Sequence, residues 1–223
     1  MINYILTRSK RKTIALYVRR DVVDVRAPLR TPKYEIDRFV ASKEKWIKNK
    51  LVYLNERAVR RESFSLDYGD MVLYRGMLYP IVHKNSSRAV FDGDFFSMPQ
   101  GLSPEEIKAA CIRIYKKLAK QDLNEKVQRF AELLSVQPLA VKVNTAKARW
   151  GSCSAKKSLN FSWRLIMADD SVIDYVVVHE LAHLLELNHS KRFWAIVMSI
   201  LPDYKERQKQ LKALQEMLAG EDW

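Results

Sequence analysis

Three of the four histidines of this chain lie in one segment, His179-Glu180-Leu181-Ala182-His183-Leu184-Leu185-Glu186-Leu187-Asn188-His189. If the segment begins as a helix, His179 and His183 are one turn apart and their imidazoles face the same space. Glu180 directly follows the first histidine and brings a carboxylate to the edge of that space. This H-E-x-x-H spacing places two metal ligands and a general base on one helix, as in zinc hydrolases.

The third histidine, His189, follows His183 by about 240° around a helix of about 3.6 residues per turn. The helix must therefore end before it, and Asn188 suits that end because asparagine tolerates the left-handed conformation found after helices. Three protein ligands leave one tetrahedral position open for water, as in a catalytic site. On a continuing helix, Glu186 would share the face of His179 and could orient a ligand or compete with His189. We expect His189 to bind, because Glu186 lies further along the helix axis.

The residues around these histidines indicate a buried helix. Ser171 and Asp174 have the spacing of a capping box, and residues 176–187 are apolar on nearly every side of a helix. Histidines and a glutamate inside such a helix are costly unless they are paired. A bound metal ion would remove that cost.

Several motifs closely resemble the YgjP-like metallopeptidase family, which is related to SprT-like and other zincin-fold proteins. They are Arg149-Trp150-Gly151-Ser152-Cys153-Ser154, Leu159–Ile166, and the histidine segment followed by Ser190-Lys191-Arg192-Phe193-Trp194. Residues 8–13, 27–29 and 46–47 are also similar to the amino-terminal half of that family. The resemblance implies a zinc ion bound by His179, His183 and His189, with Glu180 as the catalytic residue. Lys191 stands where many relatives have proline, which affects no catalytic residue.

The pattern of the whole chain predicts an α+β protein. Its second part resembles a zincin-like metallopeptidase domain, and a small basic region rich in strands precedes that domain. We place the basic region, which includes one helix, at residues 1–102 and the catalytic domain at residues 103–223. Alternation predicts strands at 14–18 and 23–27 and between 66 and 98, with hairpin turns at Arg75-Gly76 and Asp92-Gly93-Asp94. A helical period predicts helices at about 33–61, 103–134 and 190–201, and one after Pro202-Asp203.

Residues 139–166 form the candidate edge of the catalytic cleft. We expect a hairpin there, with strands from 139 and from 159 to 166 and a turn at Trp150-Gly151-Ser152. An extended substrate could add a strand to such an edge. Asn144 and Arg149 could face the cleft, where Arg149 could stabilise an oxyanion. The interpretation that we favour is that each of them holds the loop in place.

The net charge of +13 is unevenly distributed along the chain. Residues 1–61 contain 17 Lys and Arg against 6 Asp and Glu, so this first quarter carries most of the excess. A polyanion, a nucleotide or nucleic acid would most naturally bind there, and the alternative is a solvated basic face. No apolar run is long enough to cross a membrane. The two cysteines, Cys111 and Cys153, form no disulfide framework, and no secretory signal is recognisable, so we expect a cytoplasmic protein.

These observations predict a zinc-dependent hydrolase, first of all a metallopeptidase that cleaves peptides or unfolded proteins. In that hypothesis Glu180 acts as general base on metal-activated water, and the cofactor is Zn²⁺, although imidazoles also bind other divalent transition metals. The first alternative is a metal-dependent phosphohydrolase, such as a pyrophosphatase of nucleoside triphosphates. It lacks any glycine-rich phosphate loop. The second is a non-catalytic zinc module associated with nucleic acid, which would need a fourth ligand such as Cys153.

Overall fold

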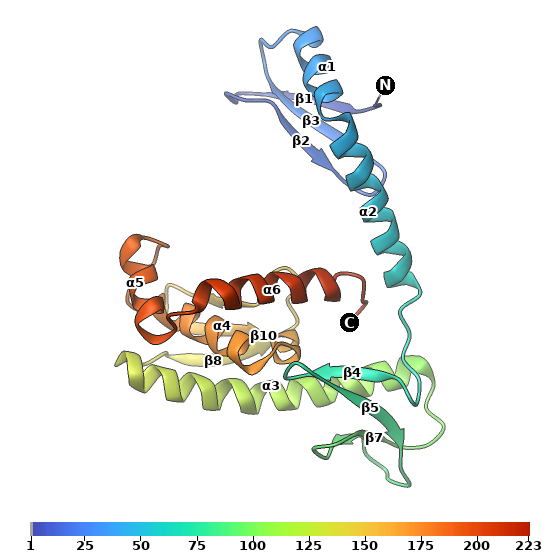
Figure 1. The fold of residues 1–223 in the computed structure, drawn as a ribbon, viewed down its shortest axis with the longest axis vertical. Helices are drawn as coiled ribbons and strands as arrows, with labels where there is room; N and C mark the ends of the chain where they lie inside the picture. The colour runs from blue at the N-terminus through green and yellow to red at the C-terminus, as the bar shows by residue number, and fades with distance from the viewer. Residues whose placement is uncertain (1) are drawn as a thin grey trace. The chain divides into compact units, whose positions relative to one another are not determined.

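The computed structural model describes residues 2–223, which form six helices and three small sheets, an α+β fold. The chain divides into two compact units (Figure 1). An amino-terminal unit comprises residues 2–64 and 218–222, and a larger unit comprises residues 65–217 and 223. None of the helices in the described chain combines the length and the apolar character needed to cross a bilayer.

In the amino-terminal unit, one three-stranded sheet packs on two helices. The strands β1 (Ile5–Ser9), β2 (Ala15–Val18) and β3 (Val23–Pro28) are ordered β1-β3-β2, with β1 parallel and β2 antiparallel to β3. Val23, Val25 and Ala27 alternate along β3 and form a core with Ile36, Val40 and Ile47 of the helices. The strands expected at 14–18 and 23–27 are confirmed, whereas β1 was not predicted.

The single helix expected at about 33–61 is in fact two helices, α1 (Lys33–Ser42) and α2 (Glu44–Glu62). Lys43 separates them with φ −106° and ψ 8°, and its N–H donates to Val40 O at 3.0 Å. The break allows buried residues on both sides of it to face the same sheet. Periodicity alone hides such a break because the apolar spacing continues through it.

The larger unit begins with a four-stranded sheet, β4 (Met71–Tyr74), β5 (Met77–His83), β6 (Val90–Phe91) and β7 (Phe96–Met98), in the order β4-β5-β7-β6. Both expected hairpins are confirmed, with antiparallel β4–β5 and β6–β7 pairs. This sheet lies in the larger unit, which begins at Ser65, whereas the sequence pattern predicted a boundary at 102/103. Two N–H groups in the turn between β4 and β5 donate to a later segment of the chain. Arg75 N donates to Ile166 O at 2.8 Å, and Gly76 N donates to Met167 O at 3.2 Å.

The helix α3 (Pro104–Leu134) is the longest element and supports the rest of the larger unit. Ser103 forms the expected capping box with Glu106, and Ser135 ends the helix in the left-handed conformation, with φ 53°. In Figure 1, α3 runs beneath β8 (Ala140–Asn144), β10 (Ser158–Ser162) and α4 (Asp170–Ala182). Its buried Tyr115 stacks on Trp163 at a ring-centroid distance of 5.4 Å.

The expected hairpin at 139–166 is wrong in its topology. β8 and β10 are parallel, and the residues expected to form a turn are instead the strand β9 (Gly151–Cys153), which pairs antiparallel with β10. The sheet order is β8-β10-β9, so β9 is an edge strand. Residues 163–167 form the 3₁₀ helix η1 (Trp163–Met167) and not the end of a strand. The last helices, α5 (Lys191–Ile200) and α6 (Tyr204–Leu218), occur where the sequence predicted them.

Candidate metal centre

The helix α4 begins at a cap that differs from the expected one. Asp169 is the N-cap, and its carboxylate accepts from Ser171 N at 2.8 Å and from Ser171 Oγ at 2.6 Å. The predicted capping box is therefore wrong, since Asp174 instead forms an ion pair with Lys126 Nζ at 2.6 Å. The carboxylates of Asp169 and Asp170 lie at the positive end of the helix dipole, where negative charge is stabilising.

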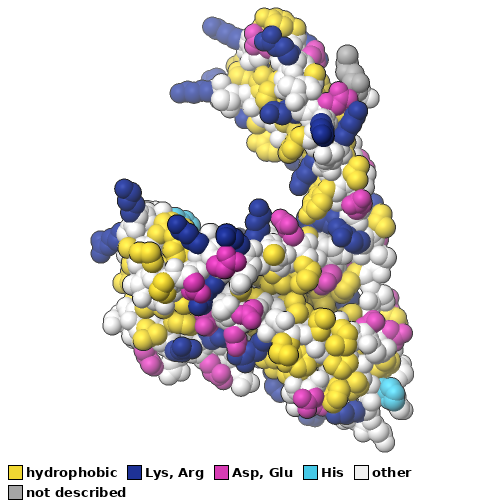
Figure 2. All heavy atoms as spheres, in the orientation of Figure 1, with side chains coloured by type: hydrophobic (Ala, Val, Ile, Leu, Met, Phe, Trp, Pro, Cys, Tyr) yellow, Lys and Arg dark blue, Asp and Glu magenta, His cyan; other side chains and the backbone are white. Residues whose placement is uncertain are grey.

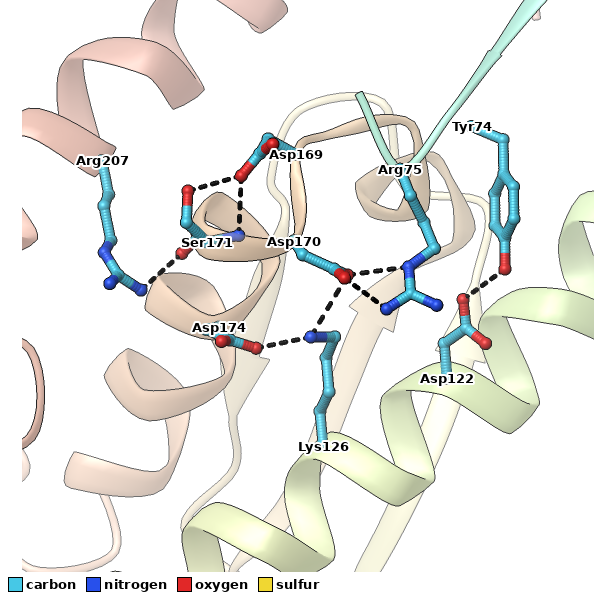
Figure 3. A network of polar contacts seen from close by, with 9 residues as sticks. All are labelled: Tyr74, Arg75, Asp122, Lys126, Asp169, Asp170, Ser171, Asp174 and Arg207. Atoms are coloured by element: carbon cyan, nitrogen blue, oxygen red, sulfur yellow. Dashed lines mark hydrogen bonds and ion pairs between the residues drawn. The ribbon is translucent and has the colours of Figure 1, made fainter. Parts of the chain in front are cut away.

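A polar network joins this helix start to three other elements (Figure 3). Arg75, from the β4–β5 turn, donates from Nε to Asp170 at 2.8 Å, and Lys126 of α3 lies 3.3 Å from the same carboxylate. Arg207 of α6 donates to Ser171 O at 2.9 Å. Contacts from three other elements thus fix the start of α4. They therefore also fix the orientation of the helix whose far end bears His179.

The structure brings the three predicted histidines together. His179 and His183 lie one turn apart near the end of α4, with ring centroids 5.0 Å apart. His189 lies 5.0 and 4.8 Å from them by the same measure. One ring nitrogen of each residue can be chosen so that all three lie within 4.8 Å of one another. Nε2 of His179 lies 3.1 Å from Nε2 of His189.

The chain reverses before His189, as its spacing required, but the residue that ends the helix is not the expected one. α4 ends at Ala182 with His183 as C-cap, and the N–H groups of Leu184, Leu185 and Glu186 bond to Leu181 O or Ala182 O at 2.9–3.0 Å. Asn188 is not among the non-glycine residues with positive φ. The prediction that Asn188 ends the helix in a left-handed conformation is therefore wrong.

The early end of α4 also determines the position of Glu186. Its carboxylate is not part of the group of potential ligand atoms formed by the three histidines. Its main-chain oxygen instead accepts from Nδ1 of His183 at 3.2 Å. Because a carbonyl can only accept, Nδ1 carries the proton and the lone pair of His183 is left on Nε2, the nitrogen available to a metal.

One aromatic residue that the sequence analysis did not single out contacts all three imidazoles. Phe193, fully buried on α5, lies with its ring centroid 4.9, 4.6 and 4.7 Å from those of His179, His183 and His189. Ser190 caps this helix by accepting from Phe193 N at 3.3 Å. The sequence signal was the H-S-x-x-F spacing, in which a helix begins directly after the third histidine.

Burial favours the neutral form of two of these imidazoles, those of His179 and His183. Burial, with the neighbouring His183 and His189 adding to it, lowers the pKa of His179 to about 3. Burial also lowers the pKa of His183, although the hydrogen bond to the Glu186 carbonyl opposes this shift. Neutral imidazole is the form that binds metal. Nδ1 of His179 is buried with no hydrogen-bond partner among the described residues.

Glu180 lies on the side of α4 that faces β9, and only 6% of its surface is exposed. The N–H of Cys153 donates to its carboxylate. A Cβ atom added to Gly151 would lie 2.6 Å from Oε1 of Glu180, so the carboxylate occupies space that only glycine leaves free at that position. Burial raises the pKa of Glu180 to about 7, against the opposing effects of the Cys153 N–H and the charge of Arg149.

The remaining candidates are placed less directly. Arg149 is exposed and acts on Glu180 through its charge. Asn144 accepts from Ala146 N at 2.9 Å through its side chain, the contact of a residue that shapes a loop. Cys153 is absent from the group of potential ligands, and burial is the main cause of the raised pKa of its thiol.

The donor set fits a divalent transition metal. Three neutral imidazoles are the ligands of many catalytic zinc sites, and they leave a coordination position open. The 3.1 Å approach of Nε2 of His179 to Nε2 of His189 is accounted for if both rings turn these lone pairs to a shared cation. His179, His183 and His189 are the residues that could hold it.

A comparison with protein families matches residues 12–214 to the YgjP-like metallopeptidase domain. The chain belongs to this family. It is a family of metal-dependent hydrolases whose catalytic metal is typically zinc. The search of curated proteins found no match.

Two solved structures of metallopeptidase zymogens are also similar to this YgjP-like chain. Abylysin of Pyrococcus abyssi is 22% identical with a TM-score of 0.39, over 41% of this chain and 92% of that one. Jannalysin of Methanocaldococcus jannaschii is 20% identical with a TM-score of 0.37, over 43% of this chain and 96% of that one.

Proposed function

We propose that this protein is a zinc-dependent metallopeptidase that cleaves peptide bonds, with Glu180 as its general base. The observation that carries the proposal is the convergence of three imidazoles at the end of the helix that also carries the buried Glu180. The imidazole nitrogens lie within 4.8 Å of one another, and Glu180 directly follows the first of these histidines in the sequence. That arrangement matches the chemistry of the family.

His179, His183 and His189 would hold the ion through neutral imidazole nitrogens. Zinc held in this way lowers the pKa of a bound water to about 7 and polarises a carbonyl oxygen. The hydrogen bond from His183 to the Glu186 carbonyl fixes which nitrogen of that ring is available. Phe193 packs against all three rings and limits their rotation.

Glu180 performs the proton transfers in this proposal. A carboxylate oxygen accepts a proton from the attacking water and then delivers it to the nitrogen of the departing amine. Burial and the N–H of Cys153 hold this carboxylate in a fixed position. Gly151 provides the space in which it lies.

The edge strand β9 would align the substrate. Ser162 N donates to Trp150 O at 2.8 Å and Ser154 N donates to Ser158 O at 2.9 Å, so these residues of the β9 segment face β10. In an antiparallel pair, successive residues alternate in direction, and every second residue directs its backbone N–H and C=O away from the partner strand. Gly151 and Cys153 are such residues, and the Cys153 N–H already binds Glu180. A peptide added as a further strand would therefore meet the N–H and C=O of Gly151.

The competing hypotheses differ in what they require of this site. A structural zinc module needs four protein ligands, whereas the group found among the described residues has three. The nucleoside-triphosphate hypothesis shares the metal site and differs in the substrate. An exposed cation near Glu180, such as Arg149, would stabilise negative charge on the reacting group in either reaction.

The substrate class can be tested with one protein preparation. Zinc-loaded protein is incubated with a pool of unfolded proteins and, separately, with a panel of nucleoside triphosphates, beside the Glu180→Gln variant. We expect new peptide amino termini with the unmodified protein and none with the variant. Release of phosphate or pyrophosphate, lost in the variant, with no peptide cleavage would replace the peptidase by the phosphohydrolase.

A further inference from the structure

The sheet of the amino-terminal unit has one face covered and one face open. Val23, Val25 and Ala27 of β3 are buried against the core residues of α1 and α2. Successive side chains of a strand point to opposite faces, so Asp24 and Arg26 point away from the helices. Their partial exposure agrees with this, since Asp24 is half-buried and Arg26 is exposed.

The strand register defines which residues share the open face. Ile5 of β1 and Tyr17 of β2 lie on either side of Asp24, and Thr7 and Ala15 lie on either side of Arg26. Ile5 is 58% exposed and Tyr17 is 44% exposed, so an apolar side chain and an aromatic side chain remain in contact with solvent there. We call these six residues the open sheet face.

Two side chains of this face, Arg26 over Tyr17, form a stacked platform. The guanidinium carbon of Arg26 lies 4.8 Å from the ring centroid of Tyr17, and its Nε lies 3.2 Å from Asp24 Oδ2. The ion pair with Asp24 holds the guanidinium against the ring. Nucleic-acid bases stack on aromatic rings and on arginine planes, and small sheets that bind single-stranded nucleic acid use this contact.

A site for single-stranded nucleic acid also needs positive charge, and the amino-terminal unit has an excess of it. Residues 1–64 and 218–222 contain 17 Lys and Arg against 9 Asp and Glu, while the rest of the chain contains 22 against 17. Lys10 and Lys12 lie in the loop between β1 and β2, and Arg19 directly follows β2. None of these three forms an ion pair with another residue in the described part of the chain. Figure 2 shows Lys and Arg side chains standing out from the surface of this unit.

We propose that the open sheet face binds single-stranded nucleic acid. Bases would stack on Tyr17 and Arg26, and the phosphates would be neutralised by cations at the two ends of the sheet, Lys10, Lys12 and Arg19. A duplex hides the faces of its bases, so the platform favours single strands. The proposal does not depend on the metal site, and either can fail without the other.

The test compares two double variants that remove the same groups from different faces of one unit. Tyr17→Ala with Arg26→Ala removes the platform. Tyr34→Ala with Arg38→Ala removes an exposed aromatic and an exposed arginine one turn apart on α1, and so loses the same charge. Binding of a fluorescein-labelled oligouridine to the full chain is followed by anisotropy at low and at moderate salt.

We expect the platform variant to bind about tenfold or more weakly, because stacking on aromatic side chains dominates sequence-tolerant binding. The α1 variant should change by less than about threefold and keep the salt dependence of the unmodified protein. Tyr17→Phe keeps a ring and should keep the affinity, which separates stacking from misfolding.

Three results would overturn the proposal. Equal losses in the two double variants would reduce the interaction to net charge. Equal competition by duplex DNA would exclude a stacking platform for single strands. Binding to vesicles that contain anionic phospholipid, with no binding of the oligouridine, would assign the basic surface to a membrane.

Discussion

Gly151 lies against Glu180 so closely that an added Cβ would be 2.6 Å from Oε1 and 2.7 Å from Cγ of the glutamate. The contact joins the edge strand β9 to α4, the helix that carries His179. It makes one backbone position of the strand a determinant of where the carboxylate lies. The N–H of Cys153, two residues further on, donates to the same carboxylate.

The first prediction concerns this contact. Gly151→Ala should displace Glu180 and lower kcat about 10²-fold or more, because a misplaced general base loses most of its effect. Zinc content should be unchanged, since the three histidines are not touched. Cys153→Ala is the control, as it keeps the backbone N–H that binds Glu180. Full activity in Gly151→Ala would show that Glu180 need not lie where the structure has it.

The second prediction concerns the ligands. His183→Ala and His189→Ala should each lose stoichiometric zinc, and activity with it, because two imidazoles hold a catalytic zinc poorly. Metal content after gel filtration, measured by mass spectrometry, tests this. His83, exposed on β5 and far from the group in sequence, provides the control as His83→Ala and should bind zinc as before. Full zinc content in His189→Ala would remove it from the ligand set.

The third prediction concerns Phe193. Phe193→Ala should weaken zinc binding about 10- to 100-fold, because the three rings lose the surface that limits their rotation. It should also destabilise the fold by about 3–5 kcal/mol, the usual cost of truncating a buried phenylalanine. Competition with a chelator measures the first effect and denaturant unfolding the second. Phe193→Leu should be intermediate in both. A folded Phe193→Ala variant with unchanged zinc affinity would contradict this role.

The fourth prediction concerns stability and pH at the start of α4. Burial acts to raise the pKa of Asp170, but the hydrogen bond from Arg75 and the charges of Lys126 and Arg75 outweigh it and leave the pKa lowered. A carboxyl with a lowered folded-state pKa contributes stability above its unfolded pKa, about 3.9, and the contribution is lost as the pH falls through the folded value.

Asp170→Asn should therefore cost about 0.5–1 kcal/mol at about pH 6, the range for partly exposed ion pairs. The difference from the unmodified protein should shrink as the pH falls below about 3.9, and it should vanish below the lowered pKa of the folded state. Denaturant unfolding at several pH values measures it. Asp94→Asn removes an exposed carboxylate without a side-chain ion pair in the described chain and serves as the control. A difference that grows as the pH falls would contradict the assigned sign.

The sequence was sufficient to predict an element wherever residues close together in the chain determine its conformation. The helix from Ser103 was predicted because its cap, its proline and its apolar period all agree. The convergence of His179, His183 and His189 followed from their spacing alone. The two turns at Arg75-Gly76 and Asp92-Gly93-Asp94 followed from glycines that adopt positive φ.

The incorrect predictions concern contacts that leave no periodic signal in the sequence, most of them between distant parts of the chain. Gly151 was expected in a turn, but it lies in a strand because β10 pairs with it and Glu180 fills the space beside it. The parallel pairing of β8 with β10 depends on β9 entering at the other side of β10. α4 ends before Asn188 because its last N–H bonds close at Leu181 and Ala182. None of these contacts leaves a periodic signal.

The most direct measurement of the central claim is the rate of peptide cleavage by the Glu180→Gln variant at equal zinc content. The account predicts that zinc content and thermal stability remain those of the unmodified protein while kcat falls by about 10²- to 10⁴-fold, because the amide cannot accept the proton from water. A variant that binds zinc and cleaves peptides at the unmodified rate would contradict the assignment of Glu180 as the general base.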